Sequence, residues 1–312
     1  MTKLKVLDPP ERSRLLDLAD EWLEDVKTTR SFRTFQSYEW PVKRVLIPFM
    51  EAEGIASPAD LDQATLNRLS NSLTDGSRKA LSLESVRTYM RQCNIWLRWC
   101  AERDGRDKVV TAKWQKPTKK EVDYLTRSEV NALESAATTA RDAVIVRTFN
   151  ETGMRLGELL GLTIEDVCKG PTGPYLRVTG TKTRTKRDVP IRPPLHRLLT
   201  DYIEKKRPRG GRSNALFLSL RRDRRSGEYE PVKKRSIESM FKSLAAAAGI
   251  KAERVYPHAL RHSLATHMMK KPNANVALVA ALLGHSPAVL LRTYSHLHAE
   301  DARDELSHLL AD

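Results

Sequence analysis

Two residues in the second half of the chain have the right types and spacing to bind one phosphate group. His258 and Arg261 lie three residues apart, directly after Pro257, where a helix is expected to begin. Residues at positions i and i+3 share a helix face, so the imidazole and the guanidinium can converge on a single phosphate. Taken alone, the pair is equally compatible with a chance pair of basic residues on a surface helix.

Three further residues could complete such a site. Arg155 stands at an expected helix start, and Glu158 follows at a distance that would let it orient the guanidinium. The alternative is a buried salt bridge without a catalytic role. Gly284 should end an apolar helix, which places His285 in the turn that follows. Tyr294 lies on the next predicted helix, where a tyrosine more often packs into the core.

These residue types fit the attack of a side chain on a phosphodiester. The guanidinium of arginine can donate two hydrogen bonds to the non-bridging oxygens of the phosphate. A general acid must also protonate the leaving oxygen, and a base must remove the proton of the nucleophile. Tyrosine needs this help because its unperturbed pKa is about 10. The sequence has no GxxxxGK[ST] loop and no acidic cluster spaced for magnesium. We therefore expect no cofactor and no metal ion.

The charge balance indicates a polyanionic partner. Lys and Arg number 54 against 39 Asp and Glu, which gives a formal net charge of +15. A basic enzyme with an ordinary solvated surface is the alternative. Clustering favours a phosphate backbone, where release of counterions supplies affinity. The basic residues gather in segments 113–120, 177–192, 205–212, 221–225 and 233–235.

The first part of the chain is expected to form a helical bundle over residues 1–110. Apolar residues recur there at helical spacing, and Pro41 should kink or divide the second helix. From 111 to 123 the periodicity lapses among Lys, Thr and Pro residues, which predicts a basic linker. The predicted helices cover 15–26, 32–49, 61–73 and 86–100.

A second domain is expected over residues 124–312, mostly helical with one small sheet. Thr126 and Glu129 have the spacing of a capping box at a helix start. Apolar residues alternate with polar ones at 176–178 and 189–191, which predicts a hairpin with Lys182 near its tip. The fold class is therefore mainly α with a small β-sheet. Further helices are predicted at 195–203, 237–248, 257–269, 276–283, 288–297 and 302–310.

In this order the motifs resemble the tyrosine recombinase (phage integrase) family, in its simple two-domain form, over nearly the whole chain. The family's first arginine box is similar to TGMRLGELLGL, which implies that Arg155 is catalytic. Its HxxR box resembles HALRHSLATHM, which implies the same for His258 and Arg261. The LLGH box implies His285, and the distance beyond it implies Tyr294 as the nucleophile.

The family's hairpin lysine matches Lys182 in VTGTKT, although Lys186 lies nearby on the same predicted hairpin. Tyr256 is a rival tyrosine, but it precedes Pro257 and is interpreted as structural. The resemblance also implies the architecture: an N-terminal helical core-binding domain that clamps DNA, followed by a mixed α/β catalytic domain.

The resemblance implies a site-specific recombinase that cleaves and rejoins double-stranded DNA through a 3′-phosphotyrosyl intermediate and a Holliday junction. Tyr294 would attack the scissile phosphate while the two arginines stabilise the charge of the phosphorane. His285 would bond a non-bridging oxygen, Lys182 would protonate the leaving 5′ oxygen, and His258 would accept the phenolic proton. The covalent link keeps the phosphodiester energy, so rejoining needs no ATP.

The implied partners are double-stranded DNA, further copies of the chain in a homotetramer on DNA, and possible accessory proteins. Leu306, Leu309 and Leu310 share one face of the predicted C-terminal helix, which could be exchanged between protomers or pack on its own domain. No membrane partner is expected, because no apolar stretch could span a bilayer. Three cysteines without a CxxC pair and the lack of a signal-peptide pattern favour the cytoplasm, with the protein associated with the nucleoid.

Two other functions fit part of these observations. A type IB topoisomerase would use similar side chains to relax DNA without exchanging partners. A catalytically inactive DNA-binding regulator would need only the basic surface and the helix-turn-helix pattern of residues 276–297.

Overall fold

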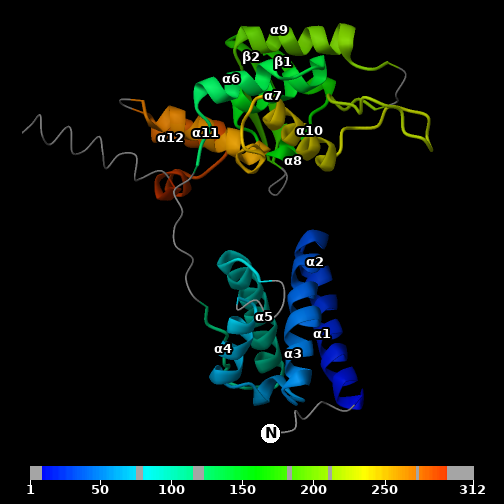
Figure 1. The fold of residues 1–312 in the computed structure, drawn as a ribbon, viewed down its shortest axis with the longest axis vertical. Helices are drawn as coiled ribbons and strands as arrows, with labels where there is room; N and C mark the ends of the chain where they lie inside the picture. The colour runs from blue at the N-terminus through cyan, green and yellow to red at the C-terminus, as the bar shows by residue number, and fades with distance from the viewer. Residues whose placement is uncertain are drawn as a thin grey trace, which may run out of the picture. The chain divides into compact units, whose positions relative to one another are not determined.

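The computed structural model describes residues 9–74, 80–114, 123–180, 185–209, 213–271 and 274–293. The chain divides into two compact units, Met1–Lys120 and Glu121–Asp312, each built around its own hydrophobic core (Figure 1).

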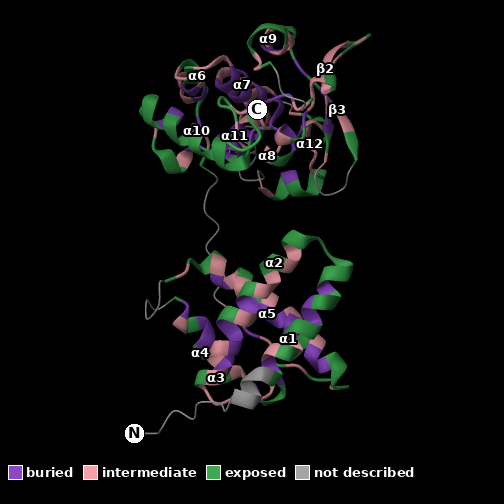
Figure 2. Ribbon diagram, turned by 90° about the vertical axis from the view of Figure 1, so that its right-hand side faces the viewer, coloured by how far each residue is buried: buried purple, intermediate pink, exposed green. Residues whose placement is uncertain are grey.

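The first unit is helical, as predicted. Pro41 ends the second helix, and a π-helical turn connects it to the next one, so the expected division at this proline is confirmed. Figure 2 shows buried and exposed residues alternating along α1, the pattern of an amphipathic helix. The elements are α1 (Pro9–Thr29), α2 (Phe32–Pro41), η1 (Val42–Leu46), α3 (Ile47–Ala52), η2 (Pro58–Asp60), α4 (Gln63–Ser72) and α5 (Leu83–Arg103).

The start of the predicted linker is held on the first unit. Ala112 is buried, and its backbone exchanges two hydrogen bonds with the Asn94 side chain on α5, at 2.7 and 3.0 Å. Two hydrogen bonds to one buried amide fix the chain direction where it leaves the bundle. Residues 115–122 lie outside the described part of the chain.

The second unit is mainly α-helical with one small sheet. Thr126 and Glu129 form the predicted capping box at the start of α6. A further helix, Pro287–Thr293, reaches the last described residue, so the predicted helix at 302–310 lies outside the described residues. The elements are α6 (Arg127–Ser135), α7 (Ala140–Thr152), α8 (Leu156–Leu160), η3 (Ile164–Asp166), β1 (Val167–Gly170), β2 (Gly173–Thr179), β3 (Lys186–Pro190), α9 (Pro193–Asp201), η4 (Tyr202–Lys206), α10 (Lys234–Ala247), η5 (Ala252–Arg254), α11 (Pro257–Met269) and α12 (Val276–Leu283).

The sheet is antiparallel in the order β1-β2-β3. The predicted hairpin is β2 and β3, with Leu176 opposite Val189 and Val178 opposite Arg187. Leu176, Val178 and Val189 are buried, because alternate residues of a strand face the same side. The sheet lies beside α9, and α11 packs between α7 and α12 (Figure 1).

Among the described residues no single helix is long and apolar enough to cross a membrane. The bent pair Val276–Leu283 and Pro287–Thr293 meets the length and composition test only when its two halves are taken together.

Candidate active site

Arg261 connects the ends of two helices. Its side chain is 1% exposed on α11, and its Nη1 and Nη2 atoms donate to the carbonyl oxygens of Gly153, at 2.6 Å, and Leu283, at 2.5 Å. Gly153 caps the C-terminus of α7, and Leu283 is the last residue of α12. Carbonyls at helix C-termini carry partial negative charge, so they hold a buried guanidinium in a fixed position.

Two glycines make this close approach possible. Gly153 and Gly284 both adopt left-handed backbone angles, with φ of 57° and 63°. A Cβ atom on Gly153 would lie 2.5 Å from the Leu283 side chain, and one on Gly284 would lie 3.0 Å from the Arg187 guanidinium. Both the backbone angle and the available space therefore require glycine at these helix ends.

Glu158 holds two arginines in place. Arg155 is the N-cap of α8; its backbone N–H donates to Glu158 Oε2 at 2.8 Å and its Nη1 to Oε1 at 3.0 Å. Arg187 on β3 donates to the same two oxygens at 2.9 and 3.0 Å. Burial raises the pKa of Glu158, but the hydrogen bonds from Arg187 and Arg155 outweigh it and set the pKa to about 2. The carboxylate is therefore charged at neutral pH.

The Arg155 side chain remains accessible despite these contacts. Its Nη2 atom donates to Gly284 O at 2.9 Å, yet the side chain is 39% exposed. A fully buried salt bridge, one of the alternatives for Arg155, therefore does not describe it. The guanidinium has further N–H groups with which it can bind an anion.

Histidines surround the two arginines. His258 and His262 lie one turn apart on α11, with ring centroids 4.6 Å apart, edge to face. Desolvation, and then the charges of Arg261 and Arg155, lower the pKa of His258, and the same causes lower that of His285 to about 4. Desolvation and the neighbouring His258 lower the pKa of His262 to about 4. All three imidazoles are therefore neutral at pH 7 and can each donate or accept a hydrogen bond.

The structure brings four of the six predicted site residues together. Arg155 and Arg261 donate to the carbonyl oxygens of Gly284 and Leu283, the two residues directly before His285. His258 lies three residues before Arg261 on α11, which places the four residues in one cluster. Lys182 lies in the connection between β2 and β3, and Tyr294 directly follows the last described helix. Both are outside the described residues, so the roles of all six remain predictions.

The two rival residues are placed by the structure. Lys186 is the exposed first residue of β3 and pairs with Thr179. Tyr256 is the N-cap of α11, and its side chain is 44% exposed. Exposure to this extent gives Tyr256 no packing role in a core.

Arg187 and His262 were not expected at the site from the sequence. Arg187 is positioned by the register of β3 against β2, where it lies opposite Val178. His262 follows His258 by four residues, a spacing that places both rings on one helix face. That spacing was the available signal for His262.

The low histidine pKa values predict a stability that falls in mild acid. Histidines of the unfolded chain take up protons below about pH 6.5, whereas His262 and His285 stay neutral in the folded state down to about pH 4. The unfolded state then binds more protons, so the free energy of unfolding should decrease from about pH 7 to about pH 5. Urea unfolding at several pH values measures this slope. A His262→Asn/His285→Asn variant should flatten it, and an unchanged slope in that variant would contradict the assignment.

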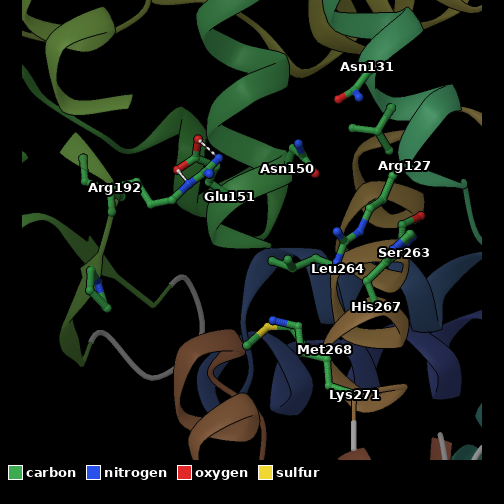
Figure 3. A pocket seen from close by; sticks show the side chains of 13 residues that line it. Arg127, Asn131, Asn150, Glu151, Arg192, Ser263, Leu264, His267, Met268 and Lys271 are labelled. Carbon is green, nitrogen blue, oxygen red and sulfur yellow. Dashed lines mark hydrogen bonds and ion pairs between the residues drawn. The ribbon is translucent and has the colours of Figure 1, made fainter. Parts of the chain in front are cut away.

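A separate cavity of about 610 Å³ lies beside α11 in the same unit. Figure 3 shows Glu151 and Arg192, joined by an ion pair, across the cavity from Leu264, His267 and Met268. None of the four clustered site residues lines this cavity. It combines apolar side chains with the cations Arg127, Arg192 and Lys271.

The chain is mainly helical in two units, and its second unit gathers arginines and neutral histidines at helix ends. The sequence model of the phage integrase family matches residues 123–301, more than half of the chain. The chain therefore belongs to the phage integrase family, the family of the tyrosine-type site-specific recombinases. The predicted family, the fold class and a site-specific recombinase activity on DNA are confirmed.

Individual tyrosine recombinases are similar to this chain in sequence. The tyrosine recombinase XerD of Corynebacterium glutamicum is 34% identical over 166 residues, which cover 53% of this chain and 51% of that protein. XerD of Staphylococcus saprophyticus is 27% identical over 300 residues, covering 92% of this chain and 96% of that protein.

Two solved structures share the fold. The XerH site-specific recombinase bound to palindromic difH substrate, in a post-cleavage complex, has a TM-score of 0.71 at 18% identity and covers 98% of this chain and 91% of its own. A lambda integrase tetramer bound to a Holliday junction has a TM-score of 0.67 at 18% identity, with 88% and 76% covered.

Proposed function

We propose that this chain cleaves and rejoins double-stranded DNA at a specific site, with Tyr294 as the nucleophile and the arginine–histidine cluster as the pocket for the scissile phosphate. The observation that carries the proposal is the convergence of Arg155, Arg261, His258 and His285, which come from three separate segments of the chain. Their guanidinium groups can stabilise the charge that develops on the non-bridging oxygens.

The reaction is an exchange of one phosphate ester for another. The phenolic oxygen of Tyr294 forms a bond to phosphorus as the bond from phosphorus to the 5′ oxygen breaks, which leaves a 3′-phosphotyrosyl link. His258 accepts the phenolic proton, for which its neutral imidazole is suited. Lys182 protonates the leaving 5′ oxygen, and His285 donates a hydrogen bond to a non-bridging oxygen. Attack by the 5′-hydroxyl of another duplex reverses the step.

The proposal gives the two units different roles in binding and cleaving DNA. In this proposal residues 1–110 clamp the DNA, residues 111–123 link the two domains, and residues 124–312 carry the catalysis. A DNA-binding role for the first unit is supported by α2, where Phe32 is 71% exposed and Trp40 is 57% exposed. Arg33 and Gln36 are exposed on the same helix. Arginine, glutamine and aromatic side chains are those that contact base edges and thymine methyl groups.

The proposed assembly is a homotetramer on DNA that passes through a Holliday junction, with the C-terminal helix exchanged between protomers. Residues 294–312 contain five acidic residues against one arginine, together with Leu306, Leu309 and Leu310. The cavity beside α11 offers cations and apolar side chains, so it matches that segment in chemistry. The lambda integrase tetramer on a Holliday junction, which shares the fold, also supports this arrangement. Such work on DNA would take place at the nucleoid, in the cytoplasm.

A nicked suicide substrate tests the proposal. DNA that flanks the gene supplies candidate sites, and a nick next to the cleavage position lets the 5′-hydroxyl fragment diffuse away, which traps the covalent link. The expected result is a protein–DNA complex that resists denaturation, with the phosphate mapped by peptide mass spectrometry to Tyr294. A link to another residue, or binding without any link as in a DNA-binding regulator, would overturn the proposal.

A second assay separates recombination from relaxation. Linear DNA that carries two copies of the site should yield recombinant products. Relaxation of supercoiled DNA without such products would instead indicate a topoisomerase.

A further inference from the structure

A narrow arm projects from the second unit. Residues 219–231, which we call the arginine arm, run out and back between Leu218 and Pro231, which form a β-bridge at its base. The backbone of Ser219 donates to Glu230 O at 2.8 Å, and that of Asp223 donates to Glu228 O at 2.8 Å. Figure 1 shows the arm in yellow, extending from the body of the unit away from α12.

The tip of the arm is held by its own hydrogen bonds. The carboxylate of Asp223 accepts hydrogen bonds from the backbone of Arg225, at 2.9 Å, and of Ser226, at 3.2 Å. Arg222 donates to Gly227 O at 2.8 Å and lies 5.1 Å from the centre of the Tyr229 ring. The carboxylate of Asp223 is thus engaged with backbone amides, and the arm has a defined shape before any partner binds.

The arm carries four arginines and three acidic residues, Asp223, Glu228 and Glu230. Arg221, Arg222, Arg224 and Arg225 are all exposed, and within the described residues none of them forms an ion pair. Together with Lys233 and the acidic residues Asp223 and Glu230 they line a hollow of about 370 Å³ at the start of α10. Like charges at this density repel one another unless an anion neutralises them.

Two lysines of the same unit share a carboxylate partner. Lys205 and Lys206, at the end of η4, both bind Asp201, at 2.9 and 2.8 Å. The four arginines of the arm, by contrast, fall within five consecutive residues and have no carboxylate partner within the described part of the chain. They are a local concentration of charge that an anionic partner would relieve.

We propose that the arginine arm binds phosphates of the DNA backbone, as a second DNA contact of this unit outside the candidate active site. This inference rests on the proposed function, since it takes duplex DNA as the ligand. Contacts to phosphates need only cations and carry no sequence information. A protein partner would need apolar or aromatic anchors, and Leu220 is the one large apolar side chain exposed on the arm. The arm therefore increases affinity and sets the position of the duplex, and it takes no part in the chemistry.

The salt dependence of DNA binding tests the arm. Each phosphate contact contributes about −0.9 to the slope of log K against log salt concentration. An Arg224→Gln/Arg225→Gln variant should therefore reduce the steepness of the slope by about 2 and weaken binding about tenfold near 0.2 M salt. Both side chains are exposed and make no hydrogen bond that holds the tip, so the variant should fold as the wild type does.

The matched control is Lys205→Gln/Lys206→Gln, which removes the same formal charge from cations that already have a carboxylate partner. It should change the slope by well under half as much. A slope in the arm variant equal to that of the wild type, or an equal change in the control, would overturn the inference. The inference would also be overturned if the arm variant no longer assembled with other protomers while its salt slope stayed unchanged. That result would assign the arm to a protein partner.

The covalent-trapping assay distinguishes this result from a failure of the proposed function. At saturating DNA the arm variant should form the covalent complex at the wild-type rate. If the wild-type protein forms no such complex, the proposed catalysis fails, while the salt slope still reports whether the arm binds DNA. Ethylation interference should then locate the lost phosphate contacts away from the cleavage position.

Discussion

Tyr294→Phe should abolish the covalent protein–DNA complex while leaving DNA affinity and the free energy of unfolding close to those of the wild type. The substitution removes a single oxygen atom, the one that would attack phosphorus. Phenylalanine has no oxygen that could attack phosphorus, so cleavage should fall by at least about 10⁴-fold. The binding energy of the duplex comes mostly from phosphate contacts elsewhere, which this change does not touch.

Trapping on a nicked substrate, with a binding assay on the same DNA, measures both quantities. The matched control is Tyr256→Phe, since this tyrosine is exposed and lies two residues before His258. It should retain wild-type cleavage. Persistence of the covalent complex in the Tyr294 variant, or its loss in the Tyr256 variant, would move the nucleophile to another residue.

Local signals in the sequence predict most elements of the second unit. Pro257 marks the first residue of α11, Gly284 ends α12, and the box of Thr126 and Glu129 begins α6. Each of these residues satisfies or limits backbone hydrogen bonding within its own turn, so the signal does not depend on the rest of the fold.

Two elements lacked such a signal. The helix α7 is buried on nearly all sides, including Asp142, Thr148 and Thr152, so its sequence shows no single apolar face. The strand β1 has only four residues and joins β2 through a turn between Gly170 and Gly173. Its pairing depends on β2 already being in place, which periodicity over four residues cannot reveal.

The candidate site shows a similar division. The spacing of the motifs predicts which side chains gather, because the residue types carry the chemistry. The groups that hold these side chains in place could not be predicted from the motifs. Arg261 donates to two backbone carbonyls, and Glu158 accepts hydrogen bonds from Arg187 on β3. Every residue has a backbone carbonyl, so the sequence does not mark which carbonyl will bind an arginine. That partner is set only when the helix ends meet in the folded chain.

Arg261→Lys is expected to have the second-largest effect, on both stability and cleavage. A lysine has one ammonium group, which cannot reach two carbonyls at separate helix ends in the geometry of a planar fork. One buried carbonyl, of Gly153 or Leu283, would lose its donor. Such a loss costs about 1–3 kcal/mol of unfolding free energy. The charge on the phosphorane would also lose an oriented donor, so cleavage at saturating DNA should fall by about 10²-fold or more.

Arg254→Lys separates these two effects. Arg254 also joins separate segments, since it binds Asp123, Glu129 and the carbonyl of Tyr124, but none of its partners belongs to the arginine–histidine cluster. Its variant should lose stability yet cleave at the wild-type rate at a temperature where circular dichroism shows both variants folded. Equal cleavage by the Arg261 and Arg254 variants under those conditions would assign Arg261 to the fold alone. A deficit confined to Arg261→Lys would instead mean that one guanidinium both joins α7 to α12 and binds the phosphate, so that the helix ends which stabilise the unit also set the geometry of its chemistry.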